Sequence, residues 1–226
     1  MARQLYELCG TDPQRIFSPY CWRSRMALAQ KGLEFDSVPW RFTETARLDF
    51  AGSRTVPVLV DGDVVVADSW AIAAYLDATY PDRPPLMPNR FTAAWCDSVL
   101  HGALARLIVS DIPALLDGAA RAYFITAREQ RFGMKIDQIT AGRDALVPAF
   151  QALLQPVRSV ITAQHFLGGA APDYGDYCVF GGFMWARSVS PLALLQEDDV
   201  LFAWRDRMLD LFGGMARAAP AGRAEQ

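Results

Sequence analysis

The sequence contains few of the residues that hold metals or disulfides. Among its 226 residues there are four cysteines and two histidines. The cysteines are Cys9, Cys21, Cys96 and Cys178. None belongs to a Cys-x-x-Cys or Cys/His pattern of the kind that binds zinc, so we expect no metal and no disulfide framework. The setting expected for such a chain is reduced and cytoplasmic. His101 and His165 have no catalytic partner visible in the sequence, and we assign both to structure.

The sequence also lacks long apolar runs and clusters of basic residues. No stretch reaches the roughly 18–20 uninterrupted apolar residues that span a bilayer, and the N-terminus leads into a strand-like segment rather than an apolar leader. With 22 basic and 25 acidic residues the net charge is −3. Such a chain has no cationic surface for nucleic acid or an anionic membrane, so we expect neither as a partner.

Hydrophobic residues, in contrast, are abundant. They make up 52% of the chain and charged residues 21%, which supplies enough apolar surface for full cores and argues against disorder. The length fits two compact domains or one large one. Four prolines between residues 81 and 90 cannot continue a helix. We therefore predict domains at 1–82 and 91–226, with a linker at 83–90.

The first domain alternates between strand and helix patterns. Strands are expected at 4–9, 35–39, 56–60 and 64–67, and helices at 19–31 and 69–80. Asp61-Gly62 is suited to a two-residue type I′ turn between the last two strands. The order βαβ, then an irregular or helical stretch, then ββα is the thioredoxin arrangement.

The second domain shows only helical patterns. Long apolar-periodic stretches cover residues 93–116, 136–154, 174–188 and 200–212. Asp173 and Asp176 have the spacing of a capping box before the third stretch, and we assign them to folding. Gly213-Gly214 and the Ala/Arg/Gly-rich tail after it are expected to fray. The predicted fold class is α/β plus all-α, with a thioredoxin-like domain followed by a helical bundle.

Three short motifs of the first domain are the candidates for chemistry. Ser18-Pro19 is typical of a helix start, Val56-Pro57 of a strand start, and Asp68-Ser69 of a second helix start. Each has an ordinary structural explanation on its own. A helix N-terminus also presents free N–H groups and a positive dipole end, which stabilise an anion such as a thiolate. A hydroxyl that donates to sulfur favours the same ionised form.

In their order and spacing the three motifs resemble the glutathione-binding half of a glutathione transferase. The quoted segments are Ser18-Pro19-Tyr20-Cys21, Thr55-Val56-Pro57-Val58-Leu59 and Ala67-Asp68-Ser69-Trp70-Ala71-Ile72. The resemblance implies that Ser18 activates the glutathione thiol and that Val56, before a cis Pro57, pairs with the cysteinyl backbone. It also implies that Asp68 and Ser69 hold the γ-glutamyl group.

Other site residues follow from the same resemblance. Arg54 is suited to the glycyl carboxylate of glutathione, although an exposed arginine beside a loop explains it equally well. Tyr20 is assigned to the pocket for the electrophile, with Phe17, Trp40 and the first helix of the second domain as further apolar lining. Cys21 is assigned to packing, because a Ser-x-x-Cys pair cannot form an internal disulfide.

The resemblance covers nearly the whole chain and extends to the serine-type classes, zeta included. Segments at 18–23, 68–77 and 204–212 are similar to bacterial β-etherases, which cleave lignin-derived aryl ethers. The implied reaction is attack of the glutathione thiolate on an electrophilic, aromatic substrate. The resemblance also implies a homodimer. Two alternatives stay open. One is a zeta-like isomerase, whose motif has cysteine where this chain has Tyr20. The other is a glutathione-binding regulatory or structural module without turnover.

Overall fold

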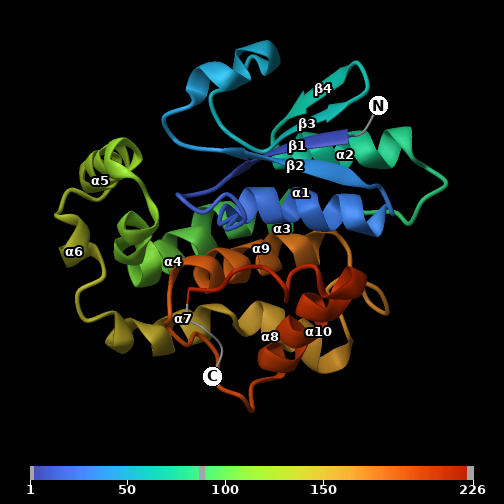
Figure 1. The fold of residues 1–226 in the computed structure, drawn as a ribbon. Coiled ribbons are helices and arrows are strands. Elements are labelled where there is room, and N and C mark those ends of the chain that lie inside the picture. Colours follow the sequence, from blue (N-terminus) through green and yellow to red (C-terminus); the bar gives the residue numbers. More distant parts are fainter. Residues whose placement is uncertain (1–2, 87–89, 223–226) are drawn as a thin grey trace.

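The computed structural model describes residues 3–86 and 90–222. Its first part is a mixed four-stranded sheet with the order β2-β1-β3-β4 (Figure 1). The strands are β1 (Arg3–Leu8), β2 (Phe35–Trp40), β3 (Val58–Asp61) and β4 (Val64–Ala67). β1 runs parallel to β2 and antiparallel to β3, and β3 runs antiparallel to β4. The connecting helices are α1 (Pro19–Gln30), the 3₁₀ helix η1 (Thr45–Ala51) and α2 (Ser69–Thr79). The predicted thioredoxin order is confirmed.

The β3–β4 hairpin is present, but its turn lies one residue further along than predicted. Asp61 pairs with Val64, so the two turn residues are Gly62 and Asp63. Gly62 has a φ of 62°, whereas Asp63 does not have a positive φ. A type I′ turn needs positive φ at both positions, so the prediction of that turn at Asp61-Gly62 was wrong. Glycine at the first turn position alone is typical of type II′.

The second part is helical, as predicted. Its first helical run consists of α3 (Arg90–Trp95), a π-helical stretch η2 (Cys96–Leu100), α4 (His101–Ile108) and the 3₁₀ helix η3 (Val109–Leu115). It is followed by α5 (Gly118–Phe132), α6 (Ile136–Ile139), η4 (Arg143–Leu146), α7 (Val147–Leu153), α8 (Gln155–Ala163), α9 (Tyr174–Val189) and α10 (Val200–Gly214).

Two features of the helical part differ from the sequence prediction. The stretch 136–154 is broken into α6, η4 and α7, because Gly142 adopts a left-handed φ of 67° between them. Helices α5 and α8 were not predicted. In α5 only Ala120 and Phe124 are buried, so the helix lacks the broad apolar stripe that sequence patterns reveal.

The helical run from Arg90 to Leu115 is long and apolar enough, by length and composition, to cross a membrane. This differs from the expectation that the sequence contains no such segment. Its apolar side, which includes Leu100, Leu104 and Ile108, is buried against its neighbours, α9 among them. That packing is typical of a core helix.

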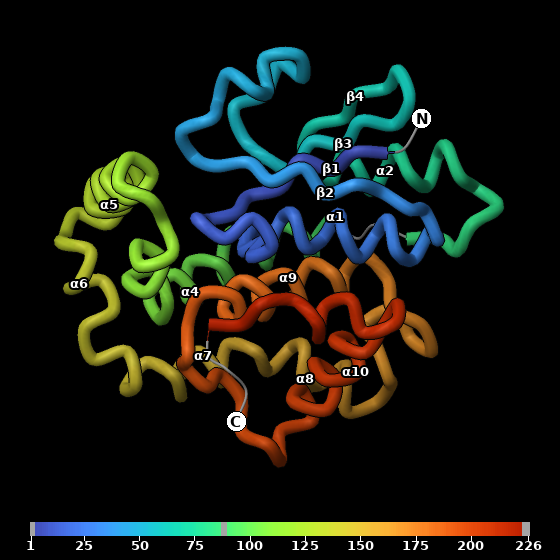
Figure 2. Tube along the Cα trace, in the orientation of Figure 1, coloured from blue at the N-terminus to red at the C-terminus, as the bar shows by residue number. Residues whose placement is uncertain are grey.

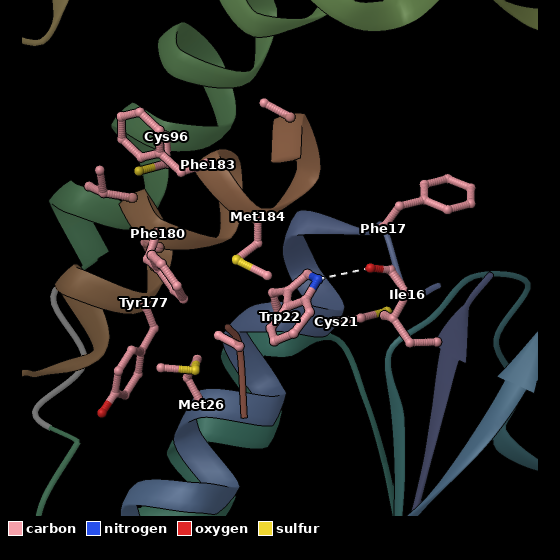
Figure 3. Packing of buried hydrophobic residues seen from close by; sticks show 14 of the residues in the cluster. Ile16, Phe17, Cys21, Trp22, Met26, Cys96, Tyr177, Phe180, Phe183 and Met184 are labelled. Atoms are coloured by element: carbon pink, nitrogen blue, oxygen red, sulfur yellow. Dashed lines mark hydrogen bonds between the residues drawn. The ribbon is translucent and has the colours of Figure 1, made fainter. Parts of the chain in front are cut away.

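The two parts of the chain are joined by the packing of α1 against α9 (Figures 1 and 3). Trp22 of α1 lies beside Met184 of α9 and Met26 beside Tyr177, and Trp22 donates from its ring N–H to the carbonyl oxygen of Ile16 at 2.9 Å. A Cβ at Gly181 of α9 would lie only 2.5 Å from the carbonyl oxygen of Pro19. The glycine therefore allows α9 to approach the first turn of α1, and this contact fixes where that turn lies.

The predicted capping box at the start of α9 is confirmed. Asp173 accepts from the backbone N–H of Asp176, and Asp176 accepts from that of Asp173, both at 3.1 Å. The Asp176 carboxylate also accepts from the N–H groups of Leu167 and Gly168 and from the ring N–H of Trp204. It is fully buried, and these four donors provide the hydrogen bonds that a buried carboxylate needs.

The C-terminal tail is ordered as far as residue 222, so the prediction that it frays was wrong for residues 215–222. Figure 2 shows this end of the trace crossing in front of α9. Arg15 donates to the carbonyl oxygen of Ala221 at 2.6 Å, and Arg187 of α9 donates to that of Ala219 at 2.8 Å. The guanidinium groups supply the partners that the tail's backbone would otherwise find in water. Residues 223–226 lie outside the described part of the chain.

The segment before α3 has no regular structure through residue 86, in keeping with its prolines. It is tied down at Leu86, whose N–H donates to Asp77 at 2.9 Å and whose carbonyl accepts from Tyr174 at 2.8 Å. Residues 87–89 of the predicted linker lie outside the described residues, and the domain boundaries remain a prediction.

Candidate functional site

A cavity of about 670 Å³ opens where the sheet meets the helical part. One wall comes from the loop before α1, the end of β2, the segment before β3 and the start of α2; the other comes from α4, α5 and α9. Of the residues predicted for the site, those that line it are Ser18, Tyr20, Arg54, Val56, Pro57 and Asp68. The fold therefore brings together nearly all the residues selected from the motifs. Ser69 is the exception.

Ser18 is the N-cap of α1, as the sequence predicts. Its Oγ accepts from the backbone N–H of Cys21 at 3.4 Å, and the residue is 5% exposed at the cavity wall. Its side chain also interacts with the Cys21 thiol, and a ligand sulfur at the cavity wall would compete with that thiol for the Ser18 O–H. The positive end of the α1 dipole lies at the same point. A hydroxyl donor at a helix N-terminus is suited to stabilising a thiolate.

The cysteines do not supply a nucleophile to this site. All four are free and buried. Cys21 is fully buried, and burial raises the pKa of its thiol to about 12; burial likewise raises the pKa of Cys9 to about 11. A thiol that stays protonated is unreactive, so Cys21 has the packing role predicted for it. In the described ranges no group of three His, Cys, Asp or Glu residues could hold a metal ion.

The segment before β3 is held in a tight turn at the cavity mouth. Ser53 Oγ accepts from the N–H of Thr55 at 3.2 Å and donates to its carbonyl at 2.8 Å. The Val56–Pro57 peptide bond is cis, as the resemblance implied. Arg54 is exposed, and its guanidinium forms no hydrogen bond or ion pair with any described residue. It is therefore free to receive a carboxylate.

Asp68 lies at the cavity wall as the N-cap of α2. Its carboxylate accepts from the N–H groups of Trp70 at 2.9 Å and Ala71 at 3.1 Å. Its φ is 82°, a conformation that side chains rarely adopt and that costs on the order of 1–3 kcal/mol. Such an outlier at a cavity is typical of a ligand-binding position. Because the carboxylate already caps α2, only its remaining lone pairs can serve a ligand.

Ser69 follows as the first residue of α2, and the structure does not bring its side chain to the cavity. The residue is 1% exposed and interacts with Tyr174 of α9. The sequence pattern Asp-Ser before a helix does not show which of the two residues is the cap. The structure gives that position to Asp68, and the role of Ser69 in ligand binding stays a prediction.

Tyr20 faces the helical wall of the cavity. Its ring packs edge-on against His101, with ring centres 5.3 Å apart, and the guanidinium of Arg23 lies 4.8 Å from its centre. Burial is the main cause of a raised pKa for Tyr20, so the phenol keeps its proton. Phe17 and Trp40, the other aromatic residues predicted for the pocket, also line the cavity. In Figure 3 Phe17 points away from Trp22 and the α1–α9 core.

His101, which the sequence assigned to structure, lines the cavity. It is 8% exposed, and neither ring nitrogen has a hydrogen-bond partner among the described residues. Asp97 lies 3.7 Å from Nδ1, but its carboxylate already accepts from Arg23 at 2.8 Å. Burial, and then the charge of Arg23, lower the pKa of His101 to about 3. The ring is therefore neutral near neutral pH and presents one N–H donor and one acceptor.

Helix α5 contributes cavity residues that sequence reasoning missed because the helix itself was missed. Phe124, Arg128 and Arg131 all line the cavity, and their spacing places them on one helix face. Trp185 of α9 lies near them in the lining, 6.1 Å from the His101 ring between ring centres. The sequence signals for α5 were Asp117, which caps its start, and Gly133, which ends it.

Two protein-family models match the chain. The one described as glutathione S-transferase, N-terminal domain, covers residues 17–79, and the one described as glutathione S-transferase, C-terminal domain, covers residues 89–212. Glutathione S-transferase Z1 of Arabidopsis thaliana is 45% identical over 91 residues, which are 35% of this chain and 40% of the relative. The match thus spans less than half of that relative's length.

Solved structures share the fold over nearly the whole chain. The glutathione transferase GSTFuA3 of Phanerochaete chrysosporium is 26% identical with a TM-score of 0.74, covering 95% of this chain and 93% of that one. A glutathione S-transferase of Ceriporiopsis subvermispora, solved in complex with glutathione, is 22% identical with a TM-score of 0.74, covering 96% and 94%. At that identity the second likeness shows the fold alone.

Proposed function

Because the chain belongs to the glutathione S-transferase family, we propose that it is a glutathione transferase in which Ser18 activates the glutathione thiol for attack on an aromatic electrophile. The observation that carries the proposal is the state of Ser18. Its Oγ caps α1 by accepting from Cys21, and the residue lines the cavity, where its O–H can turn from the buried Cys21 thiol to a ligand sulfur. One residue can thus fulfil the folding role and the chemical role together.

Glutathione fits the sheet side of the cavity. The positive end of α2, with Asp68 and Ser69, would hold the γ-glutamyl group, and the backbone of Val56 would pair with the cysteinyl unit. Arg54, which has no partner among the described residues, would receive the glycyl carboxylate. Bound in this way, glutathione would direct its cysteinyl sulfur toward Ser18.

The reaction is a substitution. A free thiol has a pKa of about 8.5, so only a few per cent is thiolate near neutral pH. The Ser18 hydroxyl and the α1 dipole lower that pKa, and the thiol proton leaves to water. The thiolate sulfur then forms a bond to the electrophilic carbon, and the leaving group departs with the electron pair of the broken bond. In a β-aryl ether the carbon lies next to an aryl ketone, and the leaving group is a phenolate.

The electrophile fits the helical side of the cavity. Tyr20, Trp185 and Val109 provide apolar surface there, and the neutral His101 ring provides a hydrogen bond. When both reactants are held in one cavity, their translational and rotational entropy is lost on binding and not in the transition state, which lowers the barrier. A homodimer and a cytoplasmic setting, both implied by the family, belong to the same proposal.

Substitutions at Ser18 test the assignment, because they separate capping from donation. Ser18→Asp keeps a good N-cap but has no O–H, whereas Ser18→Thr keeps both. Loss of one hydrogen bond to a charged sulfur is worth about 1.5–3 kcal/mol, so Ser18→Ala and Ser18→Asp should lower turnover by about tenfold or more. Ser18→Thr should retain most of it. Ser98→Ala, exposed on η2, is the matched control.

The readouts are glutathione affinity by calorimetry and turnover on a panel of aryl halides and aryl-ether ketones. Glutathione affinity should change little in the Ser18 variants. Full turnover in Ser18→Asp would contradict the catalytic role of Ser18. Binding of glutathione without turnover on any electrophile would instead favour a regulatory or structural module.

The match to glutathione S-transferase Z1 favours a second candidate, a zeta-like isomerase. In that reaction the thiolate adds to a conjugated double bond, rotation follows, and the thiolate leaves again. Glutathione is then returned unchanged, whereas substitution consumes it. Measuring the loss of free thiol during turnover distinguishes the two candidates.

A further inference from the structure

We infer that the electrophile carries a negatively charged group, such as a carboxylate on its aromatic ring, and that Arg128 and Arg131 of α5 recognise it. This inference rests on the proposed function and adds the substrate class. It starts from the charges of the helical cavity wall. Both arginines line the cavity beside Tyr123 and Phe124.

Among the described residues, neither arginine has a carboxylate partner for its charge. Across residues 3–86 and 90–222, no carboxylate forms an ion pair or hydrogen bond with Arg128 or Arg131. Other arginines of the chain are paired, such as Arg143 with Asp111 at 2.6 Å and Arg158 with Asp199 at 2.7 Å. Two unpaired cations on one wall of a cavity attract an anion.

The carboxylates that line the same cavity already have other partners. Asp97 accepts from the buried Arg23 at 2.8 Å, and Asp68 caps α2. Arg128 is itself partly buried, and its pKa is lowered first by burial and then by the charge of Arg131. Both causes show that the cavity wall leaves positive charge uncompensated. A bound carboxylate would offset both effects, because its charge stabilises the charged guanidinium.

Arg128 is also held in place for recognition. Its guanidinium lies 4.5 Å from the ring centre of Phe124, a stacking distance that fixes the planar group. Phe42 extends this aromatic wall, with its ring centre 5.6 Å from that of Phe124. An aromatic ring can pack along this wall while its acid group meets the guanidinium fork. The wall thus fits an aromatic acid better than a neutral hydrocarbon.

The glutathione carboxylates could bind the same cations, so the test must separate the two sources. Two matched electrophiles are a chlorodinitrobenzoate and the corresponding chlorodinitrobenzamide, which undergo the same substitution and differ in charge. The enzyme variants are Arg128→Met and Arg131→Met, which keep an apolar stem. Arg106→Met, exposed on α4 and outside the cavity, is the matched control.

We expect Arg128→Met to lower kcat/KM for the benzoate by about tenfold or more, the worth of one hydrogen bond to a charged group. The benzamide should change by less than about twofold, and glutathione affinity should stay constant. Arg131→Met should have a smaller effect of the same kind because Arg131 is more exposed. An equal loss for benzoate and benzamide would overturn the inference, as would a loss of glutathione affinity in Arg128→Met.

Direct binding keeps the inference testable if turnover is absent. Dinitrobenzoate and dinitrobenzamide have no chloride leaving group, and quenching of the tryptophan fluorescence, to which the cavity residues Trp40 and Trp185 contribute, reports their binding. Preference for the benzoate that is lost in Arg128→Met supports the anion site even where both chloro compounds are inert, an outcome that contradicts only the proposed function. No preference for the benzoate in the unmodified protein overturns the inference, whatever the turnover.

Discussion

The buried imidazole of His101 predicts a specific dependence of stability on pH. In an unfolded chain the pKa of histidine is about 6.5, whereas burial and the charge of Arg23 lower it to about 3 in the folded protein. Below about pH 6.5 the His101 imidazole therefore binds a proton in the unfolded chain but not in the folded chain. The free energy of unfolding is retained above that pH and falls as the pH drops through the window down to about 3.

The magnitude follows from the two pKa values. Between about pH 7 and about pH 5 the unfolded imidazole becomes almost fully protonated while the folded one stays neutral, which costs about 2 kcal/mol. Carboxylates also titrate in acid, among them Asp173, whose pKa is raised to about 6 by burial. Their contribution cancels when the unmodified protein is compared with a variant at His101.

The variant of choice is His101→Phe, which keeps an aromatic ring between Tyr20 and Trp185. No hydrogen bond is lost, because the imidazole nitrogens have no partner among the described residues. His101→Gln is a second variant in case phenylalanine packs poorly. The exposed His165→Gln is the control.

Urea unfolding followed by tryptophan fluorescence at both pH values gives the free energies. The unmodified protein and His165→Gln should lose about 2 kcal/mol more than His101→Phe on going from about pH 7 to about pH 5. Equal losses would refute the reasoning. They would mean that Asp97, 3.7 Å from Nδ1, stabilises the imidazolium in the folded protein despite its pairing with Arg23.

Three further predictions concern the contacts that hold the site in place. Gly181→Ala should lower the free energy of unfolding by about 1–3 kcal/mol, since its Cβ would lie 2.5 Å from a carbonyl of α1; urea titration measures this. Asp176→Ala should destabilise by about 3 kcal/mol or more, because four donors, among them the buried Trp204 ring N–H, lose their acceptor, and thermal unfolding should show a clearly lower Tm. Arg15→Ala should loosen the tail around Ala221, which Arg15 ties to Ser188 of α9, without loss of glutathione binding, seen as faster C-terminal proteolysis; an unchanged cleavage rate would contradict this role.

The glutathione side of the site was largely predictable because its signals are local. Ser18 before Pro19 and Asp68 before Ser69 mark helix starts through short-range chemistry that one sequence displays. The same local pattern did not show which of Asp68 and Ser69 is the cap, and so it did not show which of the two side chains faces the cavity. Successive residues of a helix differ by about 100° in direction, so a shift of one position at the cap turns a side chain from the cavity to the core.

The helical side could not be predicted because its residues meet only through packing. His101 and Trp185 belong to helices far apart in the sequence, and each has the apolar spacing of an ordinary core position. What brings them to Ser18 is the close approach of α9 to α1, which the glycine at 181 permits. Periodicity identifies a buried face but not the neighbour that covers it.

This difference between local signals and packing contacts explains why the sequence predicted the thiol site but not the residues that bind the electrophile. The fold requires Ser18 and Asp68 as helix N-caps. The residues proposed to contact glutathione are therefore also residues that a helix-start pattern identifies. Arg128 has no such signature: its guanidinium stacks on Phe124, and it forms no ion pair with any residue that the structure describes. A cation that contributes little to folding, held at a cavity wall, is best explained by a ligand, and this is why we look for the second substrate's identity on α5.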